Sequence, residues 1–269
     1  MAALHDDLDA SLKGANAGLH VRLIATFEPD IVSAPADADA DAWLAGARPD
    51  FDQFPVKDGH RTVGILLRDG QYGGRTVRDV MHRVGEEVMV SADMPIAELI
   101  PQLRHHHYRL VLRGSRIDGL VTQSDLLKLP VRMLLFGLLS HLELLLRQFV
   151  DQRAPWPAWG SLLSSRRRAQ IEKDLRQLRS ARFEPNPLEL SSFGDVLTVL
   201  TKCPKKGDDF THGSPIKRLR DDVAHAKAYI TSPSDVRDFV DCYENIERWI
   251  HRATTRLKIA NGHVSQEAH

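Results

Sequence analysis

Two side chains near the C-terminus have the types and spacing to carry out acid–base chemistry on a phosphodiester. Arg220 and His225 are separated by four residues, and Asp221 directly follows the arginine. An arginine can neutralise the charge of a phosphate, and a histidine, with an ordinary pKa of about 6.5, can transfer a proton at neutral pH. Chemistry of this kind needs no metal ion.

A helix from Ser214 to about Ile230 is predicted to position this pair. Ser214 is a suitable cap, Pro215 suits the first helical position, and apolar residues follow at helical spacing: Ile216, Leu219, Val223, Ala226 and Ile230. At about 100° per residue, Arg220 and His225 lie about 140° apart around this helix. We therefore expect a shared site in which two copies of the helix meet across a two-fold axis.

The Arg220–His225 pattern resembles the R-x4-6-H motif of HEPN ribonuclease domains. The run from Ser192 to Leu197 (Ser-Phe-Gly-Asp-Val-Leu) also resembles a phrase of HEPN-type helical bundles. The resemblance implies a homodimeric endoribonuclease that cleaves RNA through the 2′-OH, with no cofactor for catalysis. In it His225 acts as general base or acid, Arg220 stabilises the charged transition state, and Asp221 orients Arg220 or the partner histidine. The alternative is a bundle helix with an incidental arginine and histidine.

The second half of the chain, residues 130–259, is predicted to be an all-α domain, followed by a polar tail at 260–269. Residues 131–150 are strongly apolar, but Arg132, His141, Glu143 and Arg147 interrupt them. A helix buried in a bundle, partly by another subunit, is therefore favoured over a membrane span. Residues 164–182 combine an apolar stripe with seven basic side chains, which suits either a phosphate backbone or an ordinary solvated face.

Charge and cysteine content restrict the class of protein. Residues 1–130 carry 14 Lys and Arg against 19 Asp and Glu, whereas residues 131–269 carry 22 against 17. A basic half joined to an acidic half suggests a polyanion-binding domain attached to a part with another task, although chance could produce the same division. Two cysteines without metal-ligand spacing, and no apolar signal segment in residues 1–20, predict a cytoplasmic protein.

The first half, residues 20–129 after a polar segment at 1–19, contains two imperfect repeats of short strands and helices. Residues 30–37 parallel residues 88–95, and residues 54–66 parallel residues 109–121. The later copy reads as strand, helix, strand, glycine-containing turn, strand, helix. Two such copies predict one supersecondary unit used twice.

This repeated half resembles a CBS pair, also called a Bateman module. Residues 76–81 (Thr-Val-Arg-Asp-Val-Met) resemble the linker between its halves, and residues 119–125 (Gly-Leu-Val-Thr-Gln-Ser-Asp) match the family's ligand-binding pattern. The resemblance implies that Asp125 binds ribose and Thr122 binds phosphate. It also implies that backbone near Val90 and at Arg109 flanks the base, with Arg109 as a further phosphate contact. The alternative is that Thr122 and Asp125 only cap a helix.

The ligand implied by this resemblance is a purine nucleotide: AMP, ADP, ATP or S-adenosylmethionine. The first repeat has Leu67 and Gly70 where the pattern requires Thr and Asp, so one site per chain is expected. The consecutive residues His105, His106 and His107 cannot all point the same way. They are therefore expected to be solvated, and no metal site is predicted.

The sequence thus predicts an α+β CBS pair followed by an all-α, HEPN-like helical bundle. The favoured function is a nucleotide-regulated, metal-independent endoribonuclease of a toxin, defence or stress type, whose partners are RNA and a purine nucleotide. The competing function is a non-catalytic, adenine-nucleotide-sensing regulatory protein whose helical half dimerises or docks a partner. A membrane-associated regulator that uses residues 131–150 is a third possibility.

Overall fold

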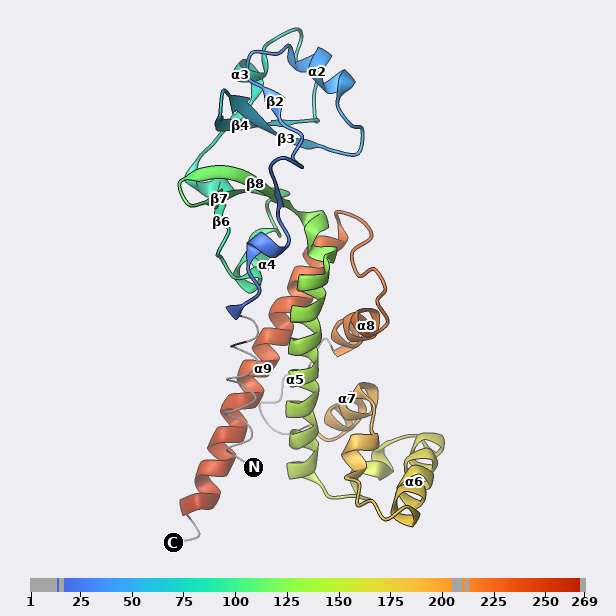
Figure 1. The fold of residues 1–269 in the computed structure, drawn as a ribbon. Coiled ribbons are helices and arrows are strands. Elements are labelled where there is room, and N and C mark those ends of the chain that lie inside the picture. The colour runs from blue at the N-terminus through green and yellow to red at the C-terminus, as the bar shows by residue number, and fades with distance from the viewer. Residues whose placement is uncertain (1–13, 15–16, 205–209, 211–212, 267–269) are drawn as a thin grey trace. The chain divides into compact units, whose positions relative to one another are not determined.

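The computed structural model describes residue 14, residues 17–204, residue 210 and residues 213–266, with no side chains given beyond residue 257. The chain divides into two compact units. One comprises Gly14–Leu134 with Ile230–Val240, and the other contains Leu135–Tyr229 and the chain from Asp241 onward. Figure 1 shows strands in the first unit and helices in the second.

The first unit contains two four-stranded mixed sheets. One sheet has the order β1 (Thr26–Phe27), β8 (Arg116–Thr122), β7 (Tyr108–Arg113) and β6 (Met89–Ser91). The other has the order β2 (Ala34–Pro35), β3 (Gln53–Asp58), β4 (Arg61–Leu67) and β5 (His82–Arg83). In each sheet one parallel pair adjoins an antiparallel hairpin. An N-terminal α+β module of two mixed sheets is therefore confirmed.

Short helices connect these strands. The α-helices are α2 (Ala40–Gly46), α3 (Val77–Val80) and α4 (Ile96–Gln102). The 3-10 helices are η1 (Val21–Leu23), η2 (Glu86–Val88) and η3 (Gln123–Leu127). Phe54, Val56 and Leu66 from the β3–β4 hairpin are fully buried together with Val77 of α3. The predicted linker at 76–81 therefore contributes to the core of the first repeat.

The two repeats are related by a constant spacing of 55 residues. This offset superposes β2 on β6, β3 on β7 and β4 on β8, and it matches the left-handed turn residues Gly59 and Gly114. Both hairpins also shift register at equivalent positions, Val56/Lys57 and Val111/Leu112. The sequence alignment of residues 54–66 with 109–121 is correct. The alignment of residues 30–37 with 88–95 is wrong by three residues.

The second unit is helical. It contains most of α5 (Leu129–Arg153) and α9 (Asp235–Gln266), together with α6 (Ser165–Ser180), α7 (Phe193–Lys202) and α8 (Gly213–Ala224). Two 3-10 helices, η4 (Trp159–Leu162) and η5 (Pro187–Leu190), lie between α5 and α7. Edge-to-face contacts among the aromatic rings of Phe149, Phe210 and Trp249 join α5 to α9, with centroids 5.9 and 5.0 Å apart.

Helix α8 ends earlier than the sequence predicts. It stops at Ala224, and Ala226 adopts a left-handed conformation with φ of 53°. The backbone N–H of Lys227 then donates to the Asp222 carbonyl and that of Ala226 to the Val223 carbonyl, which closes the helix with a Schellman motif. The predicted helix to Ile230 is therefore wrong, because the chain turns here without the usual glycine. Helix α9 continues to Gln266, so it includes most of the segment 260–269 that was predicted to be a polar tail.

Helix α5 is long and apolar enough to cross a membrane by length and composition, with a mean hydropathy of 1.6 over 18 residues. However, 56% of that window is buried inside the protein. A core helix of a water-soluble fold has the same properties, so this finding alone is weak evidence for a membrane span.

Candidate functional site

The Thr122–Asp125 motif lies where β8 passes into η3. The Asp125 Oδ2 atom accepts hydrogen bonds from the Thr122 backbone N–H at 2.6 Å and from its hydroxyl at 3.2 Å. The Oδ1 atom binds the Lys128 ammonium at 2.7 Å. A carboxylate offers about four acceptor positions, so these three interactions leave room for one hydroxyl donor. The capping predicted as the alternative is present, and it is compatible with ligand binding.

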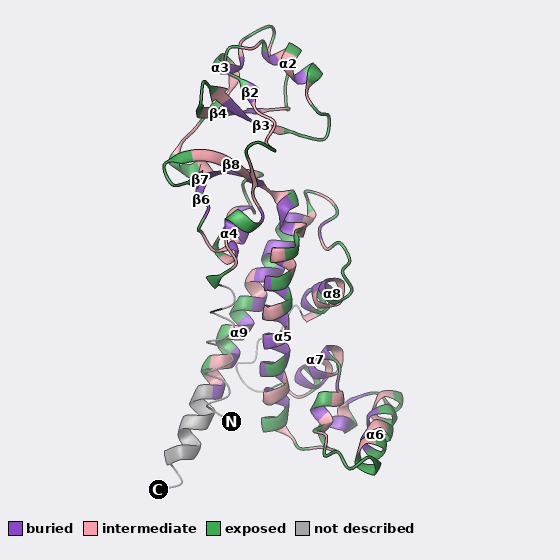
Figure 2. Cartoon of the chain, in the orientation of Figure 1, coloured by how far each residue is buried: buried purple, intermediate pink, exposed green. Residues whose placement is uncertain are grey.

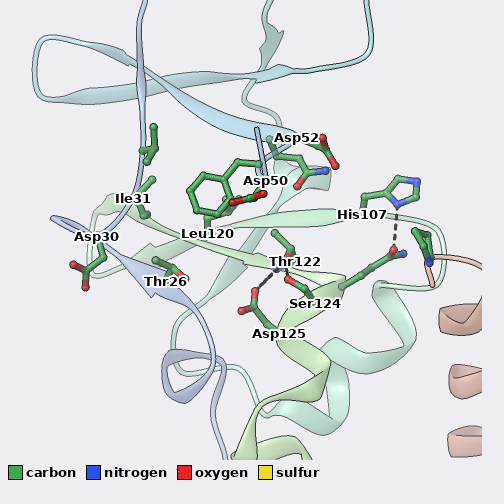
Figure 3. Close-up of a pocket in the computed structure, with 15 residues that line it drawn as sticks. Thr26, Asp30, Ile31, Asp50, Asp52, His107, Leu120, Thr122, Ser124 and Asp125 are labelled. Atoms are coloured by element: carbon green, nitrogen blue, oxygen red, sulfur yellow. Dashed lines mark hydrogen bonds between the residues drawn. The ribbon is translucent and has the colours of Figure 1, made fainter. Parts of the chain in front are cut away.

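This motif forms one side of a cleft between the two repeats. The cleft has a volume of about 350 Å³, which is within the range of small-molecule sites. Its apolar residues include Ile31, Val32, Phe51 and Leu120. Figure 3 shows Thr122, Ser124 and Asp125 on one side of the cleft and Asp50 and Asp52 on the opposite side. A flat ring and a hydroxyl-bearing group could therefore bind together here.

The cleft is strongly acidic. Four of its lining residues are aspartates: Asp30, Asp50, Asp52 and Asp125. Among the lining residues that the structure describes, none is Lys or Arg. Lys128 offsets the charge of Asp125 alone. His107, at the rim, accepts or donates one hydrogen bond with Gln123 at 3.2 Å. The walls therefore favour a ligand that is neutral, positively charged or complexed with a cation.

Two residues expected near the ligand lie elsewhere. Arg109 is only 4% exposed; its guanidinium donates to the Gln102 side chain at 3.3 Å and to the Tyr108 carbonyl at 3.2 Å. Burial lowers the pKa of Arg109 below its usual value. Val90 is buried in β6 beside Val111 of β7. The structure brings Thr122 and Asp125 together in the cleft, and it does not bring Arg109 or Val90 there.

The residues that face Thr122 and Asp125 come from the other repeat. Ile31 and Val32 precede β2, and Gln53 begins β3. The family resemblance predicted that the backbone flanking the base, near Val90 and Arg109, lies in the repeat that carries the motif. The signal available in the sequence was the duplication itself, since a repeated unit predicts that its two copies pack against each other.

Gly119 of the motif has a steric role. A Cβ at this position would lie 2.7 Å from the Phe27 ring and 2.8 Å from the Val111 side chain. Phe27 of β1 is paired with Gly119 in the sheet register. The glycine therefore lets β1 close against β8, and it sets the sheet edge from which Thr26 and Thr122 face the cleft.

The Arg220 side chain belongs to a network of charged groups in the helical unit. Its guanidinium lies 3.5 Å from Oε2 of Glu143 on α5 and 3.3 Å from Oδ1 of Asp221. Glu143 is 9% exposed and also binds Arg147 at 2.7 Å. A hydrogen bond from Lys217 holds the pKa of Asp221 below its usual value. Asp221 is thus beside Arg220, as the predicted orienting role requires.

Glu143 was not identified as a site residue from the sequence. Its position inside an apolar helix could have indicated a paired charge, because a carboxylate is costly to bury unless it is paired. From the sequence, Glu143 was interpreted only as a charge that argues against a membrane span.

His225 is the exposed residue that follows α8. Its backbone N–H donates to the Asp221 carbonyl at 3.1 Å, which makes it the last residue of the helical hydrogen-bond pattern. Among the described residues, no hydrogen bond or ion pair joins its imidazole to Arg220. Within one chain, the His225 imidazole and the Arg220 guanidinium are therefore not joined in a single site.

The other sequence motifs have structural roles. Ser192 and Asp195 form a capping box at the start of α7, and Asp195 binds Arg167 of α6 at 2.7 Å. His105, His106 and His107 are exposed, as predicted, and partial desolvation lowers the pKa of His106. In the described part of the chain there is no group of three or more His, Cys, Asp or Glu side chains able to hold a metal ion.

Comparison with known proteins identifies part of this fold. Residues 77–132 match the family model of the CBS domain. The chain therefore contains a CBS domain, and the preceding repeat of the same strand order makes the first unit a CBS-pair module. Nothing in the comparison identifies a HEPN domain, so the second unit is described as a helical region. No curated protein sequence matches the chain.

Several solved CBS structures are similar to part of the chain. The CBS domain of a bacterial CNNM/CorC-family Mg²⁺ transporter, in complex with ATP, is 22% identical and covers 47% of this chain and 96% of its own, with a TM-score of 0.37. The CBS domains of a transcriptional regulator from Streptococcus pneumoniae are 21% identical and cover 40% of this chain and 96% of their own, with a TM-score of 0.36. CBSX2 in complex with AMP is 15% identical and covers 43% of this chain and 98% of its own, with a TM-score of 0.38.

Proposed function

We propose that this protein is a cytoplasmic nucleotide-sensing regulatory protein whose CBS pair binds one adenine nucleotide or adenosine derivative per chain. The observation that carries this proposal is the 350 Å³ cleft with Thr122 and Asp125 at its wall. The free acceptor position of Asp125 suits a ribose hydroxyl. Ile31, Val32 and Leu120 provide apolar surface for the base.

Only one such site per chain is expected. At the spacing of 55 residues, Leu67 and Gly70 stand where the second repeat has Thr122 and Asp125. Neither a leucine nor a glycine side chain can bind a ribose or phosphate oxygen. The first repeat would therefore contribute Ile31 and Val32 to the site of the second repeat, without a complete site of its own.

Isothermal titration calorimetry of the purified full chain with adenosine, AMP, ATP and S-adenosylmethionine tests this proposal. We expect a stoichiometry near one, at least about a tenfold weaker affinity for Asp125→Asn, and loss of binding for Ile31→Trp, which fills the cleft without touching the capping box. Asp69→Asn, beside Gly70 in the first repeat, is the matched control and should bind like wild type. Absence of binding by all four ligands, or two equal sites per chain, contradicts the proposal.

A second candidate function for the helical region is metal-independent RNA cleavage. Two observations support this candidate function. The His225 imidazole is exposed without a partner among the described residues, and the Arg220 side chain is about one-third exposed. In this reaction the ribose 2′-oxygen attacks phosphorus and loses its proton to a base, while the 5′-oxygen leaves and gains a proton. The products are a 2′,3′-cyclic phosphate and a 5′-hydroxyl. Because one chain separates the two side chains, this candidate requires a dimer.

A further inference from the structure

The part of the chain that the structure describes leaves an apolar stripe on helix α5 exposed. The exposed fractions are 66% for Leu129, 56% for Met133, 57% for Phe136 and 41% for Leu144. At about 100° per residue these four positions, with Gly137 and Ser140 between them, fall within about 100° of the helix circumference. In Figure 2, exposed green segments alternate with buried purple segments along α5. No charged residue occupies the stripe.

The remaining surface of α5 is covered from within the chain. Leu135, Leu142 and Leu146 are fully buried, and Leu134, Leu139 and Leu145 nearly so. A helix that crossed a lipid bilayer alone would need apolar contact around its whole circumference. The uncovered part of α5 is instead one narrow band, which is the geometry of a helix–helix contact.

The stripe is complementary to itself when reversed. Leu129 and Leu144, Met133 and Ser140, and Phe136 and Gly137 are all placed symmetrically about a point midway between residues 136 and 137. In a two-fold contact, residue i touches residue j of the partner while j touches i. An antiparallel pair of α5 helices centred at this point would therefore oppose leucine to leucine. It would also place each of the two largest side chains, Met133 and Phe136, opposite a small residue.

We propose that the α5 stripe is a homodimer interface in which two copies of the chain pack antiparallel about residues 136 and 137. This surface is separate from the nucleotide cleft, and it does not depend on the ligand proposal. A second observation supports it. A pocket of about 110 Å³ opens beside Ser140, lined by Phe136, Leu139, Glu143, Arg220 and Val223, among others. In the proposed register the partner's Met133 faces Ser140, and a flexible methionine suits such a hollow.

The same pocket connects the interface to the charged network. Because Arg220 and Glu143 line it, the partner chain would cover the Arg220 side of α8. A dimer formed on this stripe therefore brings a second chain to the candidate ribonuclease site. A dimer formed elsewhere on the molecule would not.

Sedimentation of the full chain over a concentration series tests for the dimer. A stripe about 22 Å long on one helix buries less than the roughly 800 Å² per partner of a standard interface, so we expect dissociation on dilution. Wild type should shift from the 30.2 kDa monomer to twice that mass as the concentration rises. Phe136→Glu should remain monomeric with an unchanged circular dichroism spectrum. Phe183→Glu alters another exposed phenylalanine outside the stripe and should dimerise normally.

Cross-linking tests the register. Cys203 is replaced by serine, while Cys242 is left in place because burial raises the pKa of its thiol to about 12. Leu129→Cys chains mixed with Leu144→Cys chains should be linked by a short bismaleimide. Leu129→Cys chains alone should not, because the antiparallel register separates residue 129 of the two copies by about 22 Å. Efficient linking of Leu129→Cys chains to themselves contradicts the proposed register.

Two results would overturn the proposal of a homodimer. One is a wild-type protein that stays monomeric over the whole series. The other is a dimer that Phe136→Glu leaves intact. If the monomeric protein instead co-sediments with vesicles of phosphatidylcholine and phosphatidylglycerol and Phe136→Glu abolishes this, the stripe binds a lipid surface and the homodimer proposal is wrong.

Discussion

The Arg220 guanidinium on α8 lies 3.5 Å from Oε2 of Glu143 on α5, inside the same helical unit. The carboxylate also binds Arg147 through its other oxygen, and Arg147 donates to the Ser191 carbonyl at 3.0 Å. Glu143 therefore joins three segments of the unit through one nearly buried charge. Any role of Arg220 with a phosphate has to compete with this carboxylate.

Replacing Glu143 should destabilise the helical unit. Glu143→Gln removes the ion pair of Arg147 and leaves Arg220 with only the more exposed Asp221, so we expect a loss of about 1 to 3 kcal/mol in the free energy of unfolding. Urea denaturation followed by circular dichroism measures it. Asp221→Asn removes the more exposed partner of Arg220 and should cost less than about 0.5 kcal/mol. Equal effects of the two variants would show that the burial of Glu143 has no energetic consequence.

If the helical region cleaves RNA, its activity should depend on the two motif side chains and not on a metal. Arg220→Ala and His225→Ala should each lower the cleavage rate by at least about 10²-fold, because they remove charge stabilisation and proton transfer. The assay uses purified protein, single-stranded RNA and EDTA, with product ends analysed for 2′,3′-cyclic phosphate. His251→Ala, an exposed histidine on α9, is the control.

Three results count against this reaction: cleavage that EDTA abolishes, equal cleavage by wild type and both motif variants, or a fully active monomer. A mixture of Arg220→Ala chains with His225→Ala chains should recover part of the activity if the site is shared between subunits. This recovery should also be lost when both chains carry Phe136→Glu, since that change removes the proposed interface.

The sequence predicted the secondary-structure elements better than it predicted the contacts between them. The strands around Val63–Leu67 and Ile117–Val121 and the long helix at 131–150 follow from apolar spacing, which is a local property. The end of α8 was missed because Ala226 adopts a left-handed conformation that normally indicates glycine. Residues 30–37 were aligned three residues out of register because the identical run Val-Ser-Ala, at 32–34 and 90–92, dominated the match.

The site could be predicted only where its residues are close in sequence. Thr122 and Asp125 are three residues apart and are brought together by a capping box that the sequence itself specifies. Ile31 and Val32 reach the same cleft from about 90 residues earlier, and Glu143 reaches Arg220 across 77 residues. Contacts of that separation depend on how the repeats and helices pack, which a single sequence does not specify.

The acidity of the cleft should determine which adenine ligands bind well. Coulomb repulsion from Asp50 and Asp52 disfavours a free polyphosphate, so S-adenosylmethionine, or ATP with Mg²⁺, should bind more tightly than ATP in EDTA. The double variant Asp50→Asn with Asp52→Asn should raise the affinity for free ATP by about 3- to 10-fold at low salt, and by less at high salt. Asp151→Asn, on the exposed end of α5, should have no effect. A weaker affinity in the double variant would mean that these carboxylates contact the ligand directly.

The turn after α8 should be a place where glycine stabilises the protein. Ala226 is held at φ of 53°, a conformation that costs an L-residue roughly 1 to 2 kcal/mol and glycine almost nothing. Part of this gain is offset because glycine loses more backbone entropy on folding. We therefore expect Ala226→Gly to raise the free energy of unfolding by about 0.5 to 1 kcal/mol, measured as a higher urea midpoint with an unchanged slope. Ala224→Gly, two residues earlier in the last helical turn, should lower it by about 1 kcal/mol. If both substitutions destabilise the protein, the chain does not take the left-handed turn at Ala226, and the helix continues toward Ile230 as its apolar spacing predicts.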